Sequence, residues 1–331
     1  MDRRTFIAAM AALPATQAQA QMPSPMSTPA FDAVETIALW PELPPGAGDT
    51  LPVLRSTEQS PTPELFHNRV LTGIARPVLY VVRPARPDGS ALVIAPGGGY
   101  RELWVDAEGF DIADRFAAAG VTAFVLLYRL PGEGWLKAPD VPLQDAQRAM
   151  RLVRANAATY GIDAGRIGIV GFSAGGHLAA SLATRANAAV YDPRDAADGL
   201  SAKPAFAALL YPVVTMLAPY AHEASREMLL GADPSPALRA AYSCERLVGA
   251  ETPAMFLVHA LDDNFVPPEN TLSLFAALRA AKVPVEMHLF ERGGHGFNLK
   301  AATGLPVAAW PDMLVKWAAS RGYFRALKVW S

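Results

Sequence analysis

The stretch Gly171-Phe172-Ser173-Ala174-Gly175-Gly176-His177 determines how the rest of the chain can be interpreted. The residues just before it, 166–170, are apolar and β-branched, which predicts a buried strand, and residues 174–186 are typical of a helix. A Gly-x-Ser-x-Gly motif at a sharp strand-to-helix turn exposes the serine hydroxyl, and the helix N-terminus favours developing negative charge. The alternative is an ordinary Gly/Ser-rich turn. Partners for Ser173 elsewhere in the chain decide between the two.

Predicted strands and helices alternate on both sides of this motif. Short apolar or alternating segments predict further strands over residues 77–82, 91–95, 121–127, 205–211, 254–259 and 285–290. Periodic patterns predict further helices over residues 107–119, 142–160, 268–281 and 307–321. This order predicts an α/β fold with a mostly parallel sheet and helices on both faces. Residues 213–250 are expected to form a small insertion over the sheet edge, with a partial lid as one interpretation.

A general base and an acid that orients it follow two later strands. We expect His295, within Gly293-Gly294-His295-Gly296-Phe297, to act as the base, because its glycine neighbours let the imidazole reach over a serine. The acid is Asp263 or Asp262, and we favour Asp263, with Asp262 capping its own turn. The carboxyl ends of parallel strands share one edge of the sheet, so these residues are expected to meet Ser173 there.

Two other histidines and one cysteine are expected to be structural. His177 lies on the helix after the motif, and His259 ends a strand. Cys244 is the only cysteine, so no internal disulfide forms, and its neighbours do not resemble an activating site. No cluster of His, Cys, Asp and Glu has metal-ligand spacing, so we expect neither a metal nor a cofactor.

Consecutive glycines follow the strand predicted over residues 91–95. In Pro96-Gly97-Gly98-Gly99-Tyr100 the backbone N–H groups of Gly98 and Gly99 are expected to stabilise an oxyanion, together with the amide of Ala174. A structural Gly-rich turn is the alternative. A phosphate cradle is disfavoured because neither phosphate-binding glycine motif is present.

Several residues near these motifs are candidates for supporting roles. Tyr100 and Trp104 are candidates for substrate binding, although simple packing is the commoner role of such a tryptophan. Glu108 is expected to begin a helix beside the site in a structural role. Asp145 and Arg148, three residues apart, are expected to pair on a helix surface.

Composition and the N-terminus indicate the type of protein. The chain has 331 residues, is 51% hydrophobic and has a net charge of −2, which argues against nucleic-acid binding.

Residues 1–20 combine two arginines, a short apolar run and a small-residue cleavage site, which predicts a twin-arginine-type signal peptide and a periplasmic or secreted protein. The apolar run is too short for a membrane anchor. Residues 21–34 are expected to form a Pro/Ser-rich linker, and residues 35–331 one domain, with residues 40–48 as extended coil over its surface.

The motifs together resemble those of a known group. They comprise Gly97-Gly98-Gly99-Tyr100, Glu108-Gly109, Tyr128-Arg129-Leu130, Pro142-Leu143-Gln144-Asp145-Ala146, the stretch around Ser173, Tyr211-Pro212-Val213 and the stretch around His295. This set is similar to that of α/β-hydrolase esterases labelled xylanase B-like, and to acetyl-xylan and carbohydrate esterases. The resemblance implies a serine carboxylic-ester hydrolase with a small ester or acetylated carbohydrate as substrate. Pro96 departs from the lipase-type pattern, which has His before the glycines.

Three other interpretations compete with an acetyl-carbohydrate esterase. A general short-chain carboxylesterase would use the same residues. A peptidase related to prolyl oligopeptidases would share the Ser, Asp, His order, but residues 21–75 are too short for a propeller. A carbohydrate-binding module on a hydrolase scaffold is disfavoured because every catalytic position is filled.

Overall fold

Eight strands form the central sheet of the structure, a computed structural model that describes residues 34–325. In spatial order they are β1 (Thr36–Ala38), β4 (Val78–Val82), β7 (Thr122–Leu127), β5 (Ala91–Ala95), β8 (Ile167–Phe172), β9 (Phe206–Leu210), β10 (Ala254–Ala260) and β11 (Val285–Phe290). The strands from β7 to β11 run parallel, whereas β4 pairs antiparallel with both β7 and β1. The carboxyl ends of β5, β8, β10 and β11 therefore lie at one edge. The expected signal peptide, residues 1–20, lies outside the described residues.

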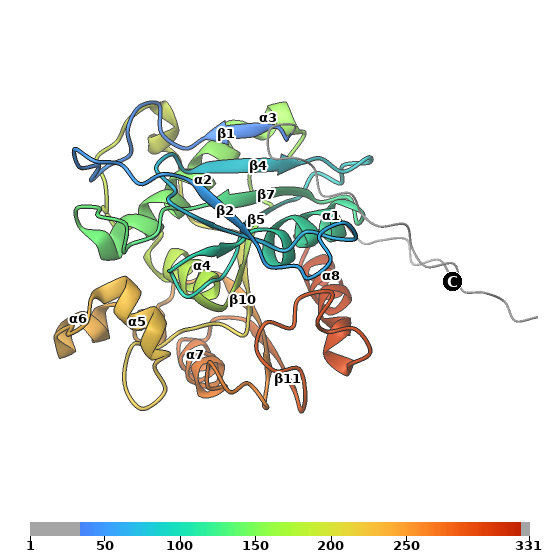
Figure 1. Ribbon diagram of the computed structural model, residues 1–331. Helices are drawn as coiled ribbons and strands as arrows, with labels where there is room; N and C mark the ends of the chain where they lie inside the picture. Colours follow the sequence, from blue (N-terminus) through green and yellow to red (C-terminus); the bar gives the residue numbers. More distant parts are fainter. Residues whose placement is uncertain (1–33, 326–331) are drawn as a thin grey trace, which may run out of the picture.

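Helices cover both faces of this sheet. They are η2 (Asp106–Phe110), α1 (Asp111–Ala117), η3 (Ala138–Asp140), α2 (Val141–Ala155), α3 (Ala157–Tyr160), α4 (Ser173–Arg185), η4 (Ala196–Gly199), α5 (Glu223–Leu230), α6 (Pro236–Ala241), η5 (Cys244–Arg246), α7 (Glu269–Ala280), η6 (Pro306–Ala309) and α8 (Trp310–Ser320). Figure 1 shows α1 and α8 to the right of the sheet and α2, α4 and α7 to its left. The rings of Phe116 and Trp310 join α1 to α8, 6.2 Å apart. The predicted α/β fold is confirmed.

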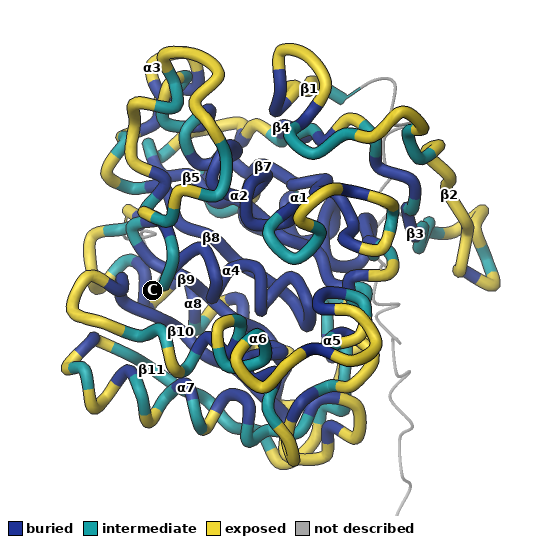
Figure 2. Tube along the Cα trace, turned by 90° about the vertical axis from the view of Figure 1, so that its left-hand side faces the viewer, coloured by how far each residue is buried: buried dark blue, intermediate teal, exposed yellow. Residues whose placement is uncertain are grey.

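Burial on both faces explains the composition of the central strands. Every residue of β5, β7, β8, β9 and β10 is buried. These strands and α4 form the dark blue centre of Figure 2, and the exposed yellow tube lies at the periphery, for example at β2 and on loops near α6. A strand with no solvent-facing side has no reason to alternate, so these segments are runs of consecutive apolar residues.

A second, three-stranded antiparallel sheet was not predicted from the sequence. It consists of β2 (Arg55–Glu58), β3 (Arg69–Thr72) and β6 (Leu103–Trp104). Its strands are short and β2 is exposed throughout, so they lack the apolar pattern that identifies a strand. The pairing of β6 with β3 fixes Trp104 just after the glycine run, opposite Val70.

Two predicted helices are interrupted. The segment predicted as 107–119 begins with the π-helical turn η2 before α1, and the segment predicted as 142–160 is divided into α2 and α3 at Asn156. The Asn156 side chain bonds back to the Leu152 carbonyl oxygen, 2.8 Å away, and so competes with the helical pattern.

The expected pairing of Asp145 with Arg148 is wrong. The Asp145 carboxylate is fully buried, forms a salt bridge of 2.8 Å with Arg129 and accepts a hydrogen bond of 2.8 Å from the Trp40 indole. Arg148 instead pairs with Asp198 at 3.0 Å. Residues 40–48 form an irregular coil whose Trp40 and Pro44 are buried, while Pro41, Glu42 and Leu43 are exposed, so the expected coil over the surface is confirmed and Trp40 anchors it.

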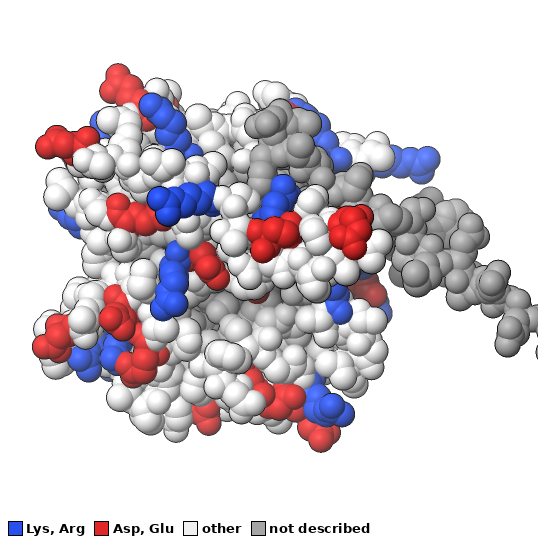
Figure 3. Space-filling model, viewed as in Figure 1, with Lys and Arg blue, Asp and Glu red and all other residues white. Residues whose placement is uncertain are grey.

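The surface bears charges of both signs. Figure 3 shows Lys and Arg interspersed with Asp and Glu over the face seen in Figure 1. Within residues 34–325, no helix is long and apolar enough to cross a membrane.

Candidate active site

The turn between β8 and α4 places Ser173. It is the first residue of α4 and has a φ of +51°, which residues other than glycine rarely adopt. A Cβ at Gly171 would lie 2.2 Å from the carbonyl oxygen of Gly175, and a Cβ at Gly175 would lie 2.1 Å from that of Ala95. Only glycine fits at either position, so the turn is held in one conformation and presents the hydroxyl at the carboxyl edge of the sheet.

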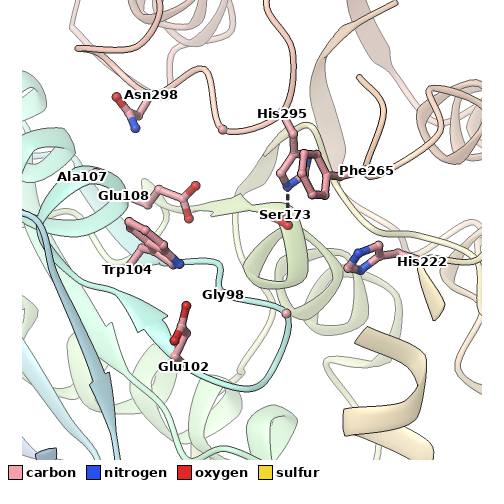
Figure 4. A pocket seen from close by; sticks show the side chains of 12 residues that line it. Gly98, Glu102, Trp104, Ala107, Glu108, Ser173, His222, Phe265, His295 and Asn298 are labelled. Carbon is pink, nitrogen blue, oxygen red and sulfur yellow. Dashed lines mark hydrogen bonds between the residues drawn. The ribbon is translucent and has the colours of Figure 1, made fainter. Parts of the chain in front are cut away.

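Ser173, His295 and Asp263 form one hydrogen-bonded chain. The Ser173 Oγ lies 2.9 Å from His295 Nε2, the dashed line in Figure 4, and His295 Nδ1 lies 2.7 Å from Asp263 Oδ2. An ionised carboxylate accepts only, so it holds a proton on Nδ1 and leaves Nε2 free to accept the proton of the serine hydroxyl. The structure therefore brings together the three residues that the sequence singled out.

The surroundings of Asp263 keep it ionised. Burial raises the pKa of its carboxyl, but hydrogen bonds from His259 and His295 outweigh burial and hold that pKa well below its usual range. Its other oxygen, Oδ1, accepts the backbone N–H groups of Phe265 and Val266, both at 2.9 Å. These bonds fix the orientation of the carboxylate as well as its charge.

Asp262 has a different role from the one expected. Its Oδ1 accepts the backbone N–H groups of Gly293 and Gly294, at 2.9 and 2.7 Å. It therefore holds the loop that carries His295 and does not cap its own turn. Asp263, and not Asp262, touches the imidazole.

The two histidines expected to be structural, His259 and His177, are buried and hydrogen-bonded. His259 Nε2 lies 3.2 Å from Asp263 Oδ2, and its Nδ1 lies 2.7 Å from Thr271 Oγ1. His177 lies between the Tyr100 hydroxyl and the Tyr242 carbonyl oxygen, 2.8 Å from each. Burial lowers the pKa of His177 to about 4, so it is neutral at pH 7.

Part of the glycine run lines the cleft beside Ser173. Gly98 and Gly99 both line it and have φ angles of +129° and +64°, and a Cβ at Gly98 would lie 2.1 Å from the Glu102 carbonyl oxygen. Among residues 34–325, nothing accepts a hydrogen bond from the N–H of Gly98 or Gly99. Ala174, in the first turn of α4, adds a third N–H that its own helix leaves unpaired. All three predicted donors therefore lie in or directly beside the cleft.

The cleft has a volume of about 360 Å³. Figure 4 shows Trp104 and Glu102 on one side of Ser173 and His222 and Phe265 on the other. Its lining consists of Gly98, Gly99, Glu102, Trp104, Ala107, Glu108, Ser173, His222, Phe265, His295, Gly296 and Asn298. Within the described residues, no group of His, Cys, Asp and Glu is arranged to hold a metal ion.

One of the two weaker candidates reaches this cleft. Trp104 lines it from β6, where substrate binding was expected. Tyr100 does not line it, because its side chain is buried and its hydroxyl is bonded to His177. The expectation that Tyr100 contacts substrate is therefore wrong: its φ of +60° turns the side chain into the core.

Several lining residues were not identified from the sequence. Glu102 and Asn298 each lie a few residues from a recognised motif, so proximity to those motifs was a usable signal. Phe265 lies two residues after Asp263 and is 69% exposed at the rim. His222 gave no signal, because it comes from the segment between β9 and β10 and reaches the cleft only through the fold.

The fold and this site define an α/β-hydrolase: a nucleophile at a strand-to-helix turn, with acid and base on loops after later strands of a mostly parallel sheet. A model of the BD-FAE family matches residues 79–278. The chain belongs to this family, within the esterase group of α/β-hydrolases.

Similar proteins include enzymes named for xylan and for acetyl esters. The chain is 36% identical over 208 residues to endo-1,4-beta-xylanase B of Butyrivibrio fibrisolvens, covering 63% of this chain and 32% of that protein. It is 32% identical over 252 residues to an acetylxylan esterase of Xylanibacter ruminicola, covering 74% of this chain and 48% of that protein. The chain thus spans half or less of the length of these curated relatives. A solved acetyl ester-xyloside bifunctional hydrolase of Caldicellulosiruptor lactoaceticus is 34% identical with a TM-score of 0.67, covering 84% of this chain and all of that one.

Proposed function

We propose that this protein is a serine carboxylic-ester hydrolase that removes O-acetyl groups from plant cell-wall carbohydrate such as acetylxylan. The observation that carries the proposal is the hydrogen-bonded chain Ser173–His295–Asp263, beside two backbone amides that have no partner among residues 34–325. Nucleophile, base, orienting acid and oxyanion donors are the four parts that acyl transfer requires.

The geometry supports a two-step reaction. Ser173 Oγ attacks the ester carbonyl carbon while its proton passes to His295 Nε2, and the amides of Gly98, Gly99 and Ala174 stabilise the oxyanion. His295 then gives that proton to the departing alcohol oxygen, which leaves an acyl-enzyme on Ser173. Water then attacks the acyl carbon while its proton passes to His295 Nε2; the bond to Ser173 Oγ breaks, His295 returns the proton to Oγ, and the carboxylic acid is released. Removal of one such oxyanion donor typically raises the barrier by about 3–4 kcal/mol.

The cleft lining supports a small polyhydroxylated alcohol. Among the described residues, nothing hydrogen-bonds to the Glu102 carboxylate or the Trp104 indole N–H. The Nδ1 of His222 accepts the Ser225 N–H, so its Nε2–H is available to the cleft. Burial lowers the pKa of His222, which keeps the ring neutral. An aromatic face with hydrogen-bonding groups around it suits a sugar ring, and the names of the similar proteins agree with this substrate class.

A general short-chain carboxylesterase is the second candidate. The observation that favours it is Phe265, an exposed aromatic side chain whose ring lies 5.8 Å from that of His295. An apolar group at the rim suits an alkyl or aryl ester as well as a sugar.

Hydrolysis assays on the wild type and Ser173→Ala test the proposal. We expect rapid cleavage of p-nitrophenyl acetate, slower cleavage of the octanoate, and acetate release from acetylated xylan. In Ser173→Ala, kcat falls by about 10⁵-fold or more. Ser181→Ala is the matched control, because Ser181 lies on the same helix but does not line the cleft.

The outcomes of these assays separate the candidates. Ester cleavage without release from xylan favours the general carboxylesterase. Equal rates in Ser173→Ala and wild type refute the mechanism. Cleavage of a proline peptide by the wild type would favour a peptidase instead.

We also propose that residues 1–20 direct export by a twin-arginine route, with cleavage near Ala20. The support is the sequence pattern alone. Replacement of Arg3 and Arg4 by lysine is expected to retain the uncleaved chain in the cytoplasm, as detected by cell fractionation and mass spectrometry. Unchanged export contradicts this proposal.

A further inference from the structure

A buried carboxylate, Glu108, lies in the cleft wall, and the mechanism above assigns it no task. It is 7% exposed and forms no ion pair within residues 34–325. Burial raises the pKa of its carboxyl, against the opposing effect of hydrogen bonds from Tyr211 and Gly97. A carboxyl group without a cation is expensive to bury, so an apolar residue would serve better if Glu108 only filled space.

Both oxygens of Glu108 accept hydrogen bonds from segments that build the site. Oε2 accepts the backbone N–H of Gly97 at 2.7 Å, and Oε1 accepts the Tyr211 hydroxyl at 2.8 Å. A Cβ at Gly97 would lie 2.7 Å from that Oε2 and 2.9 Å from the Ser173 Cβ. Glu108 therefore holds the residue that directly precedes the Gly98 and Gly99 amides, in contact distance of the nucleophile.

Tyr211 extends this connection to the base. It follows β9 with a φ of +38°, and its fully buried ring lies 5.0 Å from the His295 ring and 4.5 Å from that of Phe297. Two residues further on, the Val213 N–H donates to the Ser173 carbonyl oxygen at 3.0 Å. The segment that presents Tyr211 is thus bonded to the nucleophile residue itself.

We propose that Glu108 and Tyr211 are a pair of positioning residues that fix the oxyanion amides relative to Ser173 and His295. The proposal rests on the proposed ester hydrolysis and adds a specific requirement to it. Without the Glu108 carboxyl, the Gly97 N–H loses its partner and the peptide units of Gly98 and Gly99 shift from the oxyanion. The oxyanion exists only in the transition state and intermediates, so the loss falls on kcat and leaves KM nearly unchanged.

Three substitutions test the pair. Glu108→Leu removes both hydrogen bonds at similar size, and we expect kcat on p-nitrophenyl acetate to fall at least 100-fold with KM within about 3-fold. Tyr211→Phe removes one hydroxyl only, and we expect kcat to fall about 10-fold. Glu108→Gln restores most of the rate lost in Glu108→Leu, because an amide oxygen still accepts from Gly97 and its NH₂ donates to the Tyr211 oxygen.

Glu133 offers a matched control. Its carboxylate is also partly buried and accepts two backbone N–H groups, of Gly73 and Ile74, but it does not line the cleft. Glu133→Leu is expected to lower the melting temperature and leave kcat within about 2-fold of the wild type. A similar loss of kcat in Glu133→Leu and Glu108→Leu would overturn the proposal, since it would show only a general structural effect.

Two further outcomes would also overturn it. One is a folded Glu108→Leu protein with kcat within 3-fold of the wild type, and the other is a Glu108→Gln protein as slow as Glu108→Leu. If Glu108→Leu does not fold, Tyr211→Phe decides, and wild-type kcat in that variant refutes the pair. If Ser173→Ala cleaves the ester as fast as the wild type, the proposed function is refuted instead. The failure of the proposed function and the failure of this inference are therefore distinguishable.

Discussion

Replacement of Asp263 by asparagine should disable the base while leaving its position intact. Asp263 Oδ1 accepts two backbone N–H groups, from Phe265 and Val266, so the oxygen of an asparagine amide must occupy that position. The NH₂ group then faces His295 Nδ1, at the place where Oδ2 now accepts from it across 2.7 Å. Two donors cannot face each other. Nδ1 therefore gives up its proton, and the imidazole carries its single proton on Nε2, facing Ser173 Oγ.

The expected loss follows from this change of tautomer. An imidazole protonated at Nε2 cannot accept the serine proton, and the wrong tautomer in a comparable triad lowers kcat by about 10⁴-fold, or about 5.5 kcal/mol. His259 adds to the effect, because its Nε2 also lies near Asp263 Oδ2, at 3.2 Å. The assay is steady-state hydrolysis of p-nitrophenyl acetate, with circular dichroism to confirm folding.

Asp262→Asn is the matched control for this experiment. Asp262 accepts two backbone N–H groups through Oδ1 alone, and an amide oxygen can do the same, so kcat should stay within about 10-fold of the wild type. A folded Asp263→Asn protein that retains a tenth of wild-type activity would refute the reasoning. So would equal losses in the two variants, which would show that the loop and not the tautomer matters.

Two predictions concern stability. Gly175→Ala should lower the free energy of unfolding by at least about 3 kcal/mol or prevent folding, because the new Cβ would lie 2.1 Å from the Ala95 oxygen. In the control, Gly199→Ala, the new Cβ has no atom within 4 Å, so the free energy of unfolding should change by less than about 0.5 kcal/mol. Similar urea midpoints for the two variants would contradict this prediction. His177 has its pKa lowered by burial to about 4, so its contribution to stability is complete above about pH 6.5 and is lost as the unfolded chain takes up a proton between pH 6.5 and 4. Between pH 6.5 and 4, the free energy of unfolding of the wild type, measured with urea, should therefore fall by about 3 kcal/mol more than that of His177→Asn. Parallel plots of this free energy against pH for the two proteins would disprove the assignment.

The chain's own pattern was sufficient for seven of the eight strands of the central sheet, and only the three-residue edge strand β1 was not predicted. The predicted strand 285–290 is identical to β11, and the prediction 91–95 is identical to β5. Strand β5 is buried by helices on both faces, so it is a continuous apolar run with clear ends, whereas β11 is a half-buried edge strand in which Glu286 and His288 alternate with apolar residues. The short strands β2, β3 and β6 lack such a run, and their pairing depends on residues far away in sequence.

The same distinction applies to the site. Ser173, Asp263 and His295 were predictable because each lies within a motif that has a mechanical reason for its neighbours. His222 was not, since nothing local shows that it reaches the cleft. The error with Asp145 has the same origin: its partners Arg129 and Trp40 lie 16 and 105 residues away, and spacing on one helix says nothing about either.

The segment between β9 and β10 has a consequence for how this enzyme type diversifies. It leaves and re-enters the sheet at adjacent strands, and of its residues only His222 lines the cleft among the described residues. Its bonds to the rest of the site are near its two ends, at Val213 and Tyr242. The middle, residues 217–241, reaches the cleft through His222 and packs on the body through buried residues such as Leu229 and Leu230. Changes to its exposed positions can therefore alter which esters enter while the residues that hydrolyse them stay in place.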